Sequence, residues 1–163
     1  MTLDDINTLD AAAFTDRFGA LFEHSPWVVE RAAELRPFDD LHTGLMNAVH
    51  GANRHEQLAL IRAHPELAGK AAIDRTLTHA SAAEQGAAGL DRMSADEYAR
   101  FHALNHAYRE RFDFPFIICV RLTDKAGILA AMEQRLTNDR ESEIVTAIAQ
   151  IGEIVRLRLK DLL

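Results

Sequence analysis

The chain has 163 residues, of which 48% are apolar and 26% charged, so its composition excludes a disordered tail or linker and predicts one domain, 1–163, with a sizeable core. The formal net charge is −7 and no dense block of lysine and arginine is present, which argues against nucleic acid or an anionic membrane as the main partner. The single cysteine excludes an internal disulfide and a cysteine-based zinc site.

Neither a membrane span nor a secretory signal is predicted. The longest apolar run, Phe114 to Val120, is too short to cross a bilayer. The first ten residues, MTLDDINTLD, lack the basic region and the apolar stretch of a signal peptide. We therefore expect a cytoplasmic protein.

The fold is predicted to be all-α, a multi-helix bundle in a single domain. Glycine and proline are scarce, alanine is abundant, and apolar residues recur at three- and four-residue spacing. Helix starts are predicted where a side chain can accept first-turn amide hydrogens. In the first half of the chain these are Ser25 with Pro26, Asp39 or Asp40, and Asn53. Later starts have the spacing of a capping box, namely Ser81 with Glu84, Ser94 with Glu97, and Asn138 with Glu141.

The helical pattern breaks at His64-Pro65, because a proline disfavours helical geometry at the residue before it. A histidine at such a change of direction can be held rigidly in a pocket, and its titration near neutral pH suits acid/base chemistry. A lone histidine is more often structural, so both interpretations remain open.

The segment from Ser81 to Gln85 also has two interpretations. Ser81 and Glu84 can serve only to cap a helix. A helix start with free amides can equally bind an anionic or amide-rich ligand, and Gln85 offers a donor and an acceptor to a ring with amide edges.

Two further histidines, His102 and His106, share a helix face at a spacing that suits a metal ion. No third ligand is evident in the sequence, so two solvated histidines are the commoner explanation. We assign no metal.

The apolar hexamer FPFIIC, Phe114 to Cys119, interrupts the pattern a second time. Pro115 favours extended backbone, although part of a buried helix is the alternative. Extended backbone in a helical protein has no sheet to pair with, so its N–H and C=O groups need other partners. We therefore interpret the hexamer as one wall of a ligand site. Cys119 has no evident activator nearby and is interpreted as a packed apolar residue.

The last helix carries an arginine on its apolar face. Arg158 lies within this stripe, so its guanidinium is directed inward and needs an anion or several acceptors. Three alternatives remain for the Arg158 side chain: it pairs with an internal acid, it reaches past the stripe to solvent, or it binds an anionic ligand. The apolar members of the stripe are Ile144, Ile148, Ile151, Val155 and Leu162.

Six separated blocks of the sequence stand out together, namely EHSPW, RPF, HPELAGK, SAAEQ, LNHAYRERFDFPFIIC and RLRL. In this order they resemble one family, the 2-oxo-4-hydroxy-4-carboxy-5-ureidoimidazoline (OHCU) decarboxylases of uric acid breakdown. The resemblance extends from about Leu21 to Leu163. One departure is Asp113, where many members have glycine in an FGFPF motif.

The resemblance implies an all-helical, cofactor-free enzyme, usually a homodimer, that converts OHCU into (S)-allantoin. Its pathway neighbours would be urate oxidase and hydroxyisourate hydrolase. The resemblance implies that His64 is the catalytic histidine and Glu84 its acidic partner. The implied substrate-binding residues are Pro65, Ser81, Glu84, Gln85, Phe116, Ile117, Ile118, Cys119, Val120 and Arg158.

Two rival interpretations follow from the residues alone. A non-catalytic helical module that binds a partner through an apolar groove would explain the helix pattern equally well. It does not explain His64-Pro65, the apolar wall and an inward Arg158 appearing together. The second rival is a metal-dependent hydrolase that uses His102 and His106.

Overall fold

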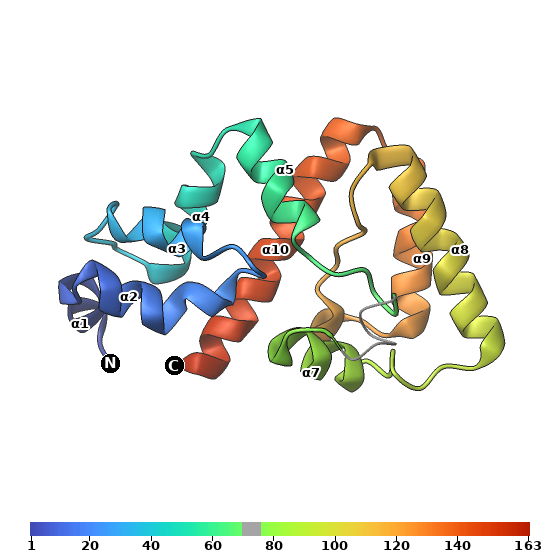
Figure 1. The fold of residues 1–163 in the computed structure, drawn as a ribbon, viewed down its shortest axis with the longest axis horizontal. Coiled ribbons are helices and arrows are strands. Elements are labelled where there is room, and N and C mark those ends of the chain that lie inside the picture. The colour runs from blue at the N-terminus through green and yellow to red at the C-terminus, as the bar shows by residue number, and fades with distance from the viewer. Residues whose placement is uncertain (70–75) are drawn as a thin grey trace. The chain divides into compact units, whose positions relative to one another are not determined.

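The computed structural model describes residues 1–69 and 76–163, and the regular structure in these ranges is helical, which confirms the all-α prediction (Figure 1). Within the same ranges no helix is both long and apolar enough to cross a membrane. Two short 3-10 helices are η1 (Gly19–Leu21) and η2 (Val120–Leu122). The α-helices are α1 (Leu3–Thr8), α2 (Ala11–Phe18), α3 (Pro26–Ala33), α4 (Leu41–His50), α5 (Arg54–Arg62), α7 (His79–Ala87), α8 (Ala95–Phe112), α9 (Lys125–Arg135) and α10 (Arg140–Leu162).

The described chain divides into two compact units. The first unit comprises residues 1–63 and 152–163, and the second comprises residues 64–151. The long helix α10 contributes its first half to the second unit and its last turns to the first unit.

The core of the first unit lies among α2, α3 and α4, which pack against one another in chain order (Figure 1). The rings of Phe14 and Phe18 meet edge to face with their centroids 5.0 Å apart. Each fully buried side chain of this size contributes about 1.5–3 kcal/mol to folding, so this core accounts for the association of the three helices. Other fully buried members are Val28, Val29, Leu45, Val49 and Val155.

The core of the second unit is an aromatic cluster around Tyr108 of α8. The Tyr108 ring lies 4.6 Å from that of Phe112 and 5.3 Å from that of Phe116, centroid to centroid. Phe114 also packs against Tyr108 at 5.9 Å. The aromatic residues of the FPFIIC hexamer are therefore anchored directly to the helix that precedes it.

Several predicted helix starts are confirmed. Asp40 accepts the amide hydrogen of Thr43 at the start of α4. The predicted start at Asn53 is confirmed and proves to be a capping box with Glu56 at the start of α5. The capping box predicted for Ser94 and Glu97 is present at the start of α8. Each such cap stabilises its helix by about 1 kcal/mol.

Three details of the predicted helix starts are wrong. Ser25 precedes α3 but does not cap it with its side chain, because its hydroxyl donates to the carbonyl of Glu23. The Asn138 start is shifted by one residue, since Asp139 accepts from the amide of Ser142. The predicted Ser81 cap is also misplaced, because Thr78 caps α7 and Ser81 is the third residue inside it.

The apolar stripe of α10 is confirmed except at its C-terminal end. Ile144, Ile151 and Val155 are fully buried and Ile148 is nearly so. Leu162 is 40% exposed, so its predicted place in the core is wrong. Helix α10 extends about one turn beyond the buried core, and the spacing of its apolar residues alone does not show where the core ends.

Candidate active site

His64 lies where the sequence predicts a change of chain direction. Helix α5 ends at Arg62 with Ala63 as its C-cap residue, and His64 and Pro65 lead into a non-helical loop. The His64 side chain is buried, with 8% exposure, whereas Pro65 is half-buried. The predicted end of the helix is thus confirmed. The last residue of the HPELAGK block, Lys70, lies outside the described residues.

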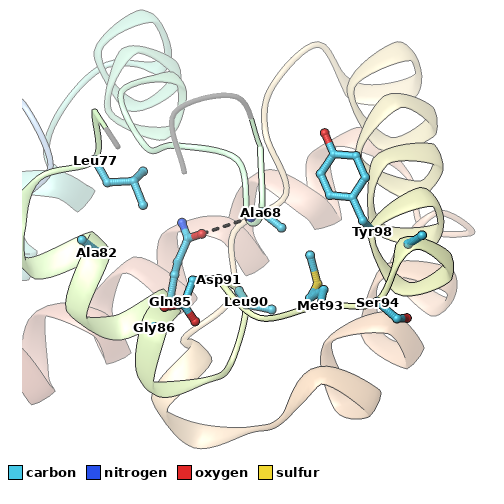
Figure 2. Close-up of a pocket in the computed structure, with 11 residues that line it drawn as sticks. Ala68, Leu77, Ala82, Gln85, Gly86, Leu90, Asp91, Met93, Ser94 and Tyr98 are labelled. Atoms are coloured by element: carbon cyan, nitrogen blue, oxygen red, sulfur yellow. Dashed lines mark hydrogen bonds between the residues drawn. The ribbon is translucent and has the colours of Figure 1, made fainter. Parts of the chain in front are cut away.

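Polar side chains from two helices hold the loop that follows His64. The side-chain oxygen of Gln85 accepts from the amide of Ala68 at 3.1 Å (Figure 2). Its side-chain nitrogen donates to the carbonyl of Glu66 at 3.4 Å. Asn105 of α8 donates to the carbonyl of Leu67 at 2.8 Å. These bonds satisfy buried backbone groups that have no helical partner. The loop is therefore fixed from α7 and α8.

A salt bridge completes this support at the edge of the loop. The guanidinium of Arg109 donates to the Glu66 carboxylate at 2.7 Å. Ala68 adopts a left-handed conformation with φ +52°, which costs about 1–2 kcal/mol for a residue with a Cβ atom. The loop therefore needs the hydrogen bonds of Gln85 and Asn105 to keep this shape.

Helix α7 presents one buried polar face. Ser81 and Gln85 are spaced four residues apart and are both 5% exposed, whereas Glu84 is half-buried. The helix packs against η2, which begins at Val120. The expectation that backbone amides from Ser81 onward are free for a ligand is wrong, because Thr78 accepts from the amides of Ser81 and Ala82. The side chains on this face are the groups that a ligand can meet.

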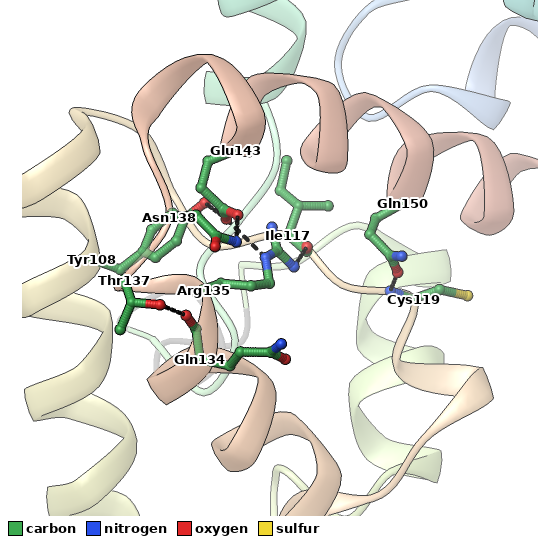
Figure 3. Close-up of polar contacts among 9 residues, drawn as sticks. All are labelled: Tyr108, Ile117, Cys119, Gln134, Arg135, Thr137, Asn138, Glu143 and Gln150. Carbon is green, nitrogen blue, oxygen red and sulfur yellow. Dashed lines mark hydrogen bonds and ion pairs between the residues drawn. The ribbon is translucent and has the colours of Figure 1, made fainter.

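The segment between α8 and η2 contains neither helix nor strand over residues 113–119. All the apolar residues of the FPFIIC hexamer are buried except Ile118, which is half-buried. The carbonyl of Ile117 accepts from Arg135 at 2.7 Å, and the amide of Cys119 donates to Gln150 at 2.9 Å (Figure 3). Helices α9 and α10 thus each supply a side-chain partner to one backbone group of the hexamer.

Gln85 lines a cavity of about 650 Å³ (Figure 2). Its size is in the ordinary range for a small-molecule site. Gln85 and Ala68, which hydrogen-bond each other, form part of its wall. The remaining lining residues are Leu77, Ala82, Gly86, Leu90, Asp91, Met93, Ser94, Ala95 and Tyr98.

Arg158 belongs to the first unit, where it is buried with 8% exposure. Its Nη2 donates to the Glu23 carboxylate at 2.8 Å and its Nη1 to the carbonyl of Leu21 at 3.3 Å. The inward direction read from the helix period is confirmed, and of the three expectations the internal acid is the partner present. Glu23 is itself only 3% exposed, so the pair shields two charges that neither side chain could bury alone.

His102 and His106 are exposed on α8. The His102 ring stacks against that of Tyr98, with centroids 6.2 Å apart. Among residues 1–69 and 76–163, no group of three or more His, Cys, Asp or Glu side chains is arranged to hold a metal ion.

Asn105 and Gln150 are among the residues that organise the site and that the sequence did not predict. Asn105 is 5% exposed on the face of α8 that carries Phe101 and Tyr108. A polar side chain on an apolar helix face was the available signal. The signal for Gln150 is weaker, because this residue is only half-buried on α10.

A small helical protein with a buried histidine, a supported loop and a polar helix face has the components of an enzyme that binds a small polar ring. The family model described as OHCU decarboxylase matches residues 7–160. The chain therefore belongs to the OHCU decarboxylase family.

Individual relatives agree with this assignment. The chain is 44% identical to the 2-oxo-4-hydroxy-4-carboxy-5-ureidoimidazoline decarboxylase of Haloferax volcanii over 99% of this chain and 95% of that protein. It is 37% identical to the decarboxylase of the same name from Mus musculus, covering 100% and 93% of the two chains. It is also 42% identical to the uric acid degradation bifunctional protein PucL of Bacillus subtilis, over 99% of this chain and only 33% of that protein.

Two solved structures share the fold. A crystal structure of (S)-allantoin synthase matches with a TM-score of 0.75 and 26% identity, covering 100% of this chain and 54% of that chain. A crystal structure of OHCU decarboxylase in the presence of (S)-allantoin matches with a TM-score of 0.69 and 21% identity, covering 90% and 96% of the two chains. The second likeness supports the fold alone.

Proposed function

We propose that this protein is a carboxy-lyase that removes CO₂ from OHCU and protonates the product to give (S)-allantoin in uric acid degradation. The observation that carries the proposal is the full-length family match to chains of that name. The His64-Pro65 loop, held by Gln85 and Asn105, supports it from the geometry.

The substrate chemistry explains why such a site is sufficient. OHCU carries a carboxylate on a carbon that also bears a hydroxyl group, beside a ring C=N bond. That bond can accept the electron pair left when CO₂ departs, so the substrate supplies its own electron sink and we propose a cofactor-independent reaction. The protein must then orient the ring, stabilise charge and deliver one proton.

We assign the proton transfer to His64. An imidazole is suited to act as acid and base near neutral pH. Its burial and the hydrogen-bonded loop beside it support a fixed ring position. Glu84, half-buried on α7, either orients His64 or hydrogen-bonds the hydroxyl or ureido group of the substrate. Proton delivery to one face gives one enantiomer.

For the binding of the ring we assign the side chains of Pro65, Ser81 and Gln85 together with the Phe116–Val120 segment. Gln85 already bonds Ala68 and Glu66, so it would position the loop as well as contact the substrate. Apolar packing by Phe116, Ile117, Cys119 and Val120 would exclude water from the reacting carbon.

The backbone of Ile118 is the natural hydrogen-bonding edge of this segment. The carbonyl of Ile117 points to Arg135 and the amide of Cys119 points to Gln150. The peptide bonds on both sides of Ile118 are trans, so the N–H and C=O of Ile118 point away from these two partners. Such a donor and acceptor pair complements the amide edge of a ureido or lactam group.

Arg158 is proposed to bind an anionic group of the substrate, as the family resemblance implies. Its pairing with Glu23 and Leu21 fixes the plane of the guanidinium. The same contacts would serve a purely structural role. Arg158→Ala should therefore raise the KM for OHCU, and an unchanged KM and rate would assign Arg158 to structure alone.

We further propose that the two units act together as one catalytic domain, 1–163, in a cytoplasmic homodimer. Enzymes of the classes urate oxidase and hydroxyisourate hydrolase would supply the substrate. One relative is itself named a uric acid degradation bifunctional protein, which supports this pathway context.

The decisive experiment generates OHCU freshly from urate and follows the circular dichroism of the product after the protein is added. We expect an optically active product and a rate above the spontaneous one. Racemic allantoin at the spontaneous rate would refute the proposal.

His64→Asn should lower kcat by about 10²–10⁴-fold while leaving the binding of (S)-allantoin in place. His102→Asn, at an exposed position on α8, is the matched control and should keep wild-type turnover. A near-normal rate in His64→Asn would remove the role assigned to His64.

A further inference from the structure

We propose that Gln150 and the buried pair Arg135–Glu143 are positioning residues, which hold the Phe116–Val120 segment so that the backbone of Ile118 is presented to the substrate. This inference rests on the proposed function. It assigns a role to residues that do not themselves touch the ring.

The Arg135–Glu143 ion pair is almost completely buried. Glu143 is fully buried, and the Arg135 side chain is 9% exposed. Nε of Arg135 donates to the Glu143 carboxylate at 2.8 Å, and Nη1 donates to the carbonyl of Ile117 at 2.7 Å (Figure 3). One arginine thus links a buried carboxylate to the backbone of the substrate segment.

Two further side chains fix the carboxylate. The hydroxyl of Tyr108 donates to one oxygen of Glu143 at 2.6 Å, and the amide nitrogen of Asn138 donates to the other at 3.0 Å. Burial and the hydrogen bond to Glu143 raise the pKa of Tyr108, so its hydroxyl stays protonated as a donor. Three donors around one carboxylate leave the guanidinium a single orientation.

The guanidinium also packs on an aromatic residue of the same segment. It lies over the ring of Phe116, 4.2 Å from the centroid. Arg135 therefore contacts Phe116 through its face and Ile117 through an N–H group. These two contacts fix both a side chain and a carbonyl of adjacent residues, which a simple apolar side chain could not do.

Gln150 fixes the next peptide group. Its side-chain oxygen accepts from the amide of Cys119 at 2.9 Å, and the side chain is half-buried on α10. Arg135 and Gln150 therefore hold the two peptide groups on either side of Ile118. Because each trans peptide is rigid, fixing one of its polar groups fixes the opposite one. The direction of the Ile118 N–H and C=O follows from these two bonds.

A purely structural role would predict a different arrangement. Buried ion pairs are a weak source of stability compared with apolar residues of the same volume. Their value lies in directional contacts, and here Arg135 and Gln150 each direct a polar group to the backbone of the proposed substrate segment.

The test uses Gln150, because its half-buried side chain permits substitution without opening the core. Gln150→Leu keeps the approximate size and removes the acceptor, whereas Gln150→Glu retains an acceptor oxygen. We expect Gln150→Leu to weaken (S)-allantoin binding and kcat/KM by about three- to tenfold, the value of one hydrogen bond. Gln150→Glu should recover most of this loss. The amide of Cys119 should exchange its hydrogen faster in Gln150→Leu.

The matched control is Gln57→Leu. Gln57 also makes a side-chain bond to a backbone group, the carbonyl of Val49, but it lies in the first unit. Its replacement should lower stability without changing KM or product binding. Equal kinetic loss in both leucine variants, or none in Gln150→Leu, would overturn the positioning role. Wild-type protein that leaves OHCU to decay spontaneously would instead refute the proposed function.

Discussion

Asp113 ends helix α8 in a backbone conformation that disfavours most L-residues. Its φ is +61° and its ψ is 34°. Its amide donates to the carbonyl of Arg109 at 2.8 Å, which closes the last helical turn. This left-handed conformation costs a residue with a Cβ atom about 1–2 kcal/mol of conformational free energy, although the cost is smaller for a short polar side chain such as aspartate. The glycine found here in many family members is the residue that this turn favours.

We therefore expect Asp113→Gly to be at least as stable as the wild type and Asp113→Ala to be less stable. In Asp113→Ala the left-handed conformation lowers the free energy of unfolding by the full amount of about 1–2 kcal/mol. About 0.4–1 kcal/mol of this loss is offset, because the unfolded chain of the alanine variant has less conformational entropy than that of the glycine variant. The difference between these two ranges is about 0–1.6 kcal/mol in favour of Asp113→Gly, with a central value of about 0.8 kcal/mol. That central value corresponds to about 2–3 °C in Tm for a chain of this size.

Glu110 provides the control, because it is an exposed residue inside the same helix. There alanine should be more stable than glycine by about 1 kcal/mol, so the order of the two substitutions is reversed. Urea denaturation of the four variants, followed by circular dichroism, measures both differences. The same order at Asp113 and Glu110 would refute the conformational argument.

Three further perturbations test other parts of the structure. Gly44→Ala places a Cβ atom 2.6 Å from Cγ of the buried Phe38 ring, so overpacking of about 1–3 kcal/mol should outweigh the helix propensity gained, and urea denaturation should show a net loss. The hydrogen bond from Arg31 lowers the pKa of Glu56 from 4.5 to about 2. The stabilisation is therefore present above pH 4.5 and lost as pH falls toward 2, and Glu56→Gln should differ from wild type in urea denaturation only at the higher pH. Thr78→Ala should destabilise the protein by about 1 kcal/mol in the same assay, since it removes the cap of α7.

The start of α7 shows why a local pattern can place a helix correctly and its cap wrongly. Ser81 and Glu84 have the spacing of a capping box, but Thr78 also precedes a possible first turn. Both patterns satisfy first-turn amides, so local chemistry does not choose between them. Burial decides which residue caps α7, because Ser81 and Gln85 occupy the face of this helix that is hidden from solvent.

The orientation of Arg158 was predictable, but its partner was not. The helix period fixes which way a side chain points, and burial of a guanidinium requires an acceptor. Glu23 lies 135 residues earlier in the chain, and nothing in the sequence links it to Arg158 rather than to another acid.

Two of the non-helical segments in the second unit depend on side chains of neighbouring helices for their backbone hydrogen bonds. Residues 65–69 and 113–119 have buried backbone groups without a helix or sheet to pair them. Gln85 and Asn105 supply partners to the first segment, and Arg135 and Gln150 supply them to the second. A polar side chain on an otherwise apolar helix face therefore indicates a nearby stretch of irregular backbone, and in this fold both stretches carry residues of the proposed active site.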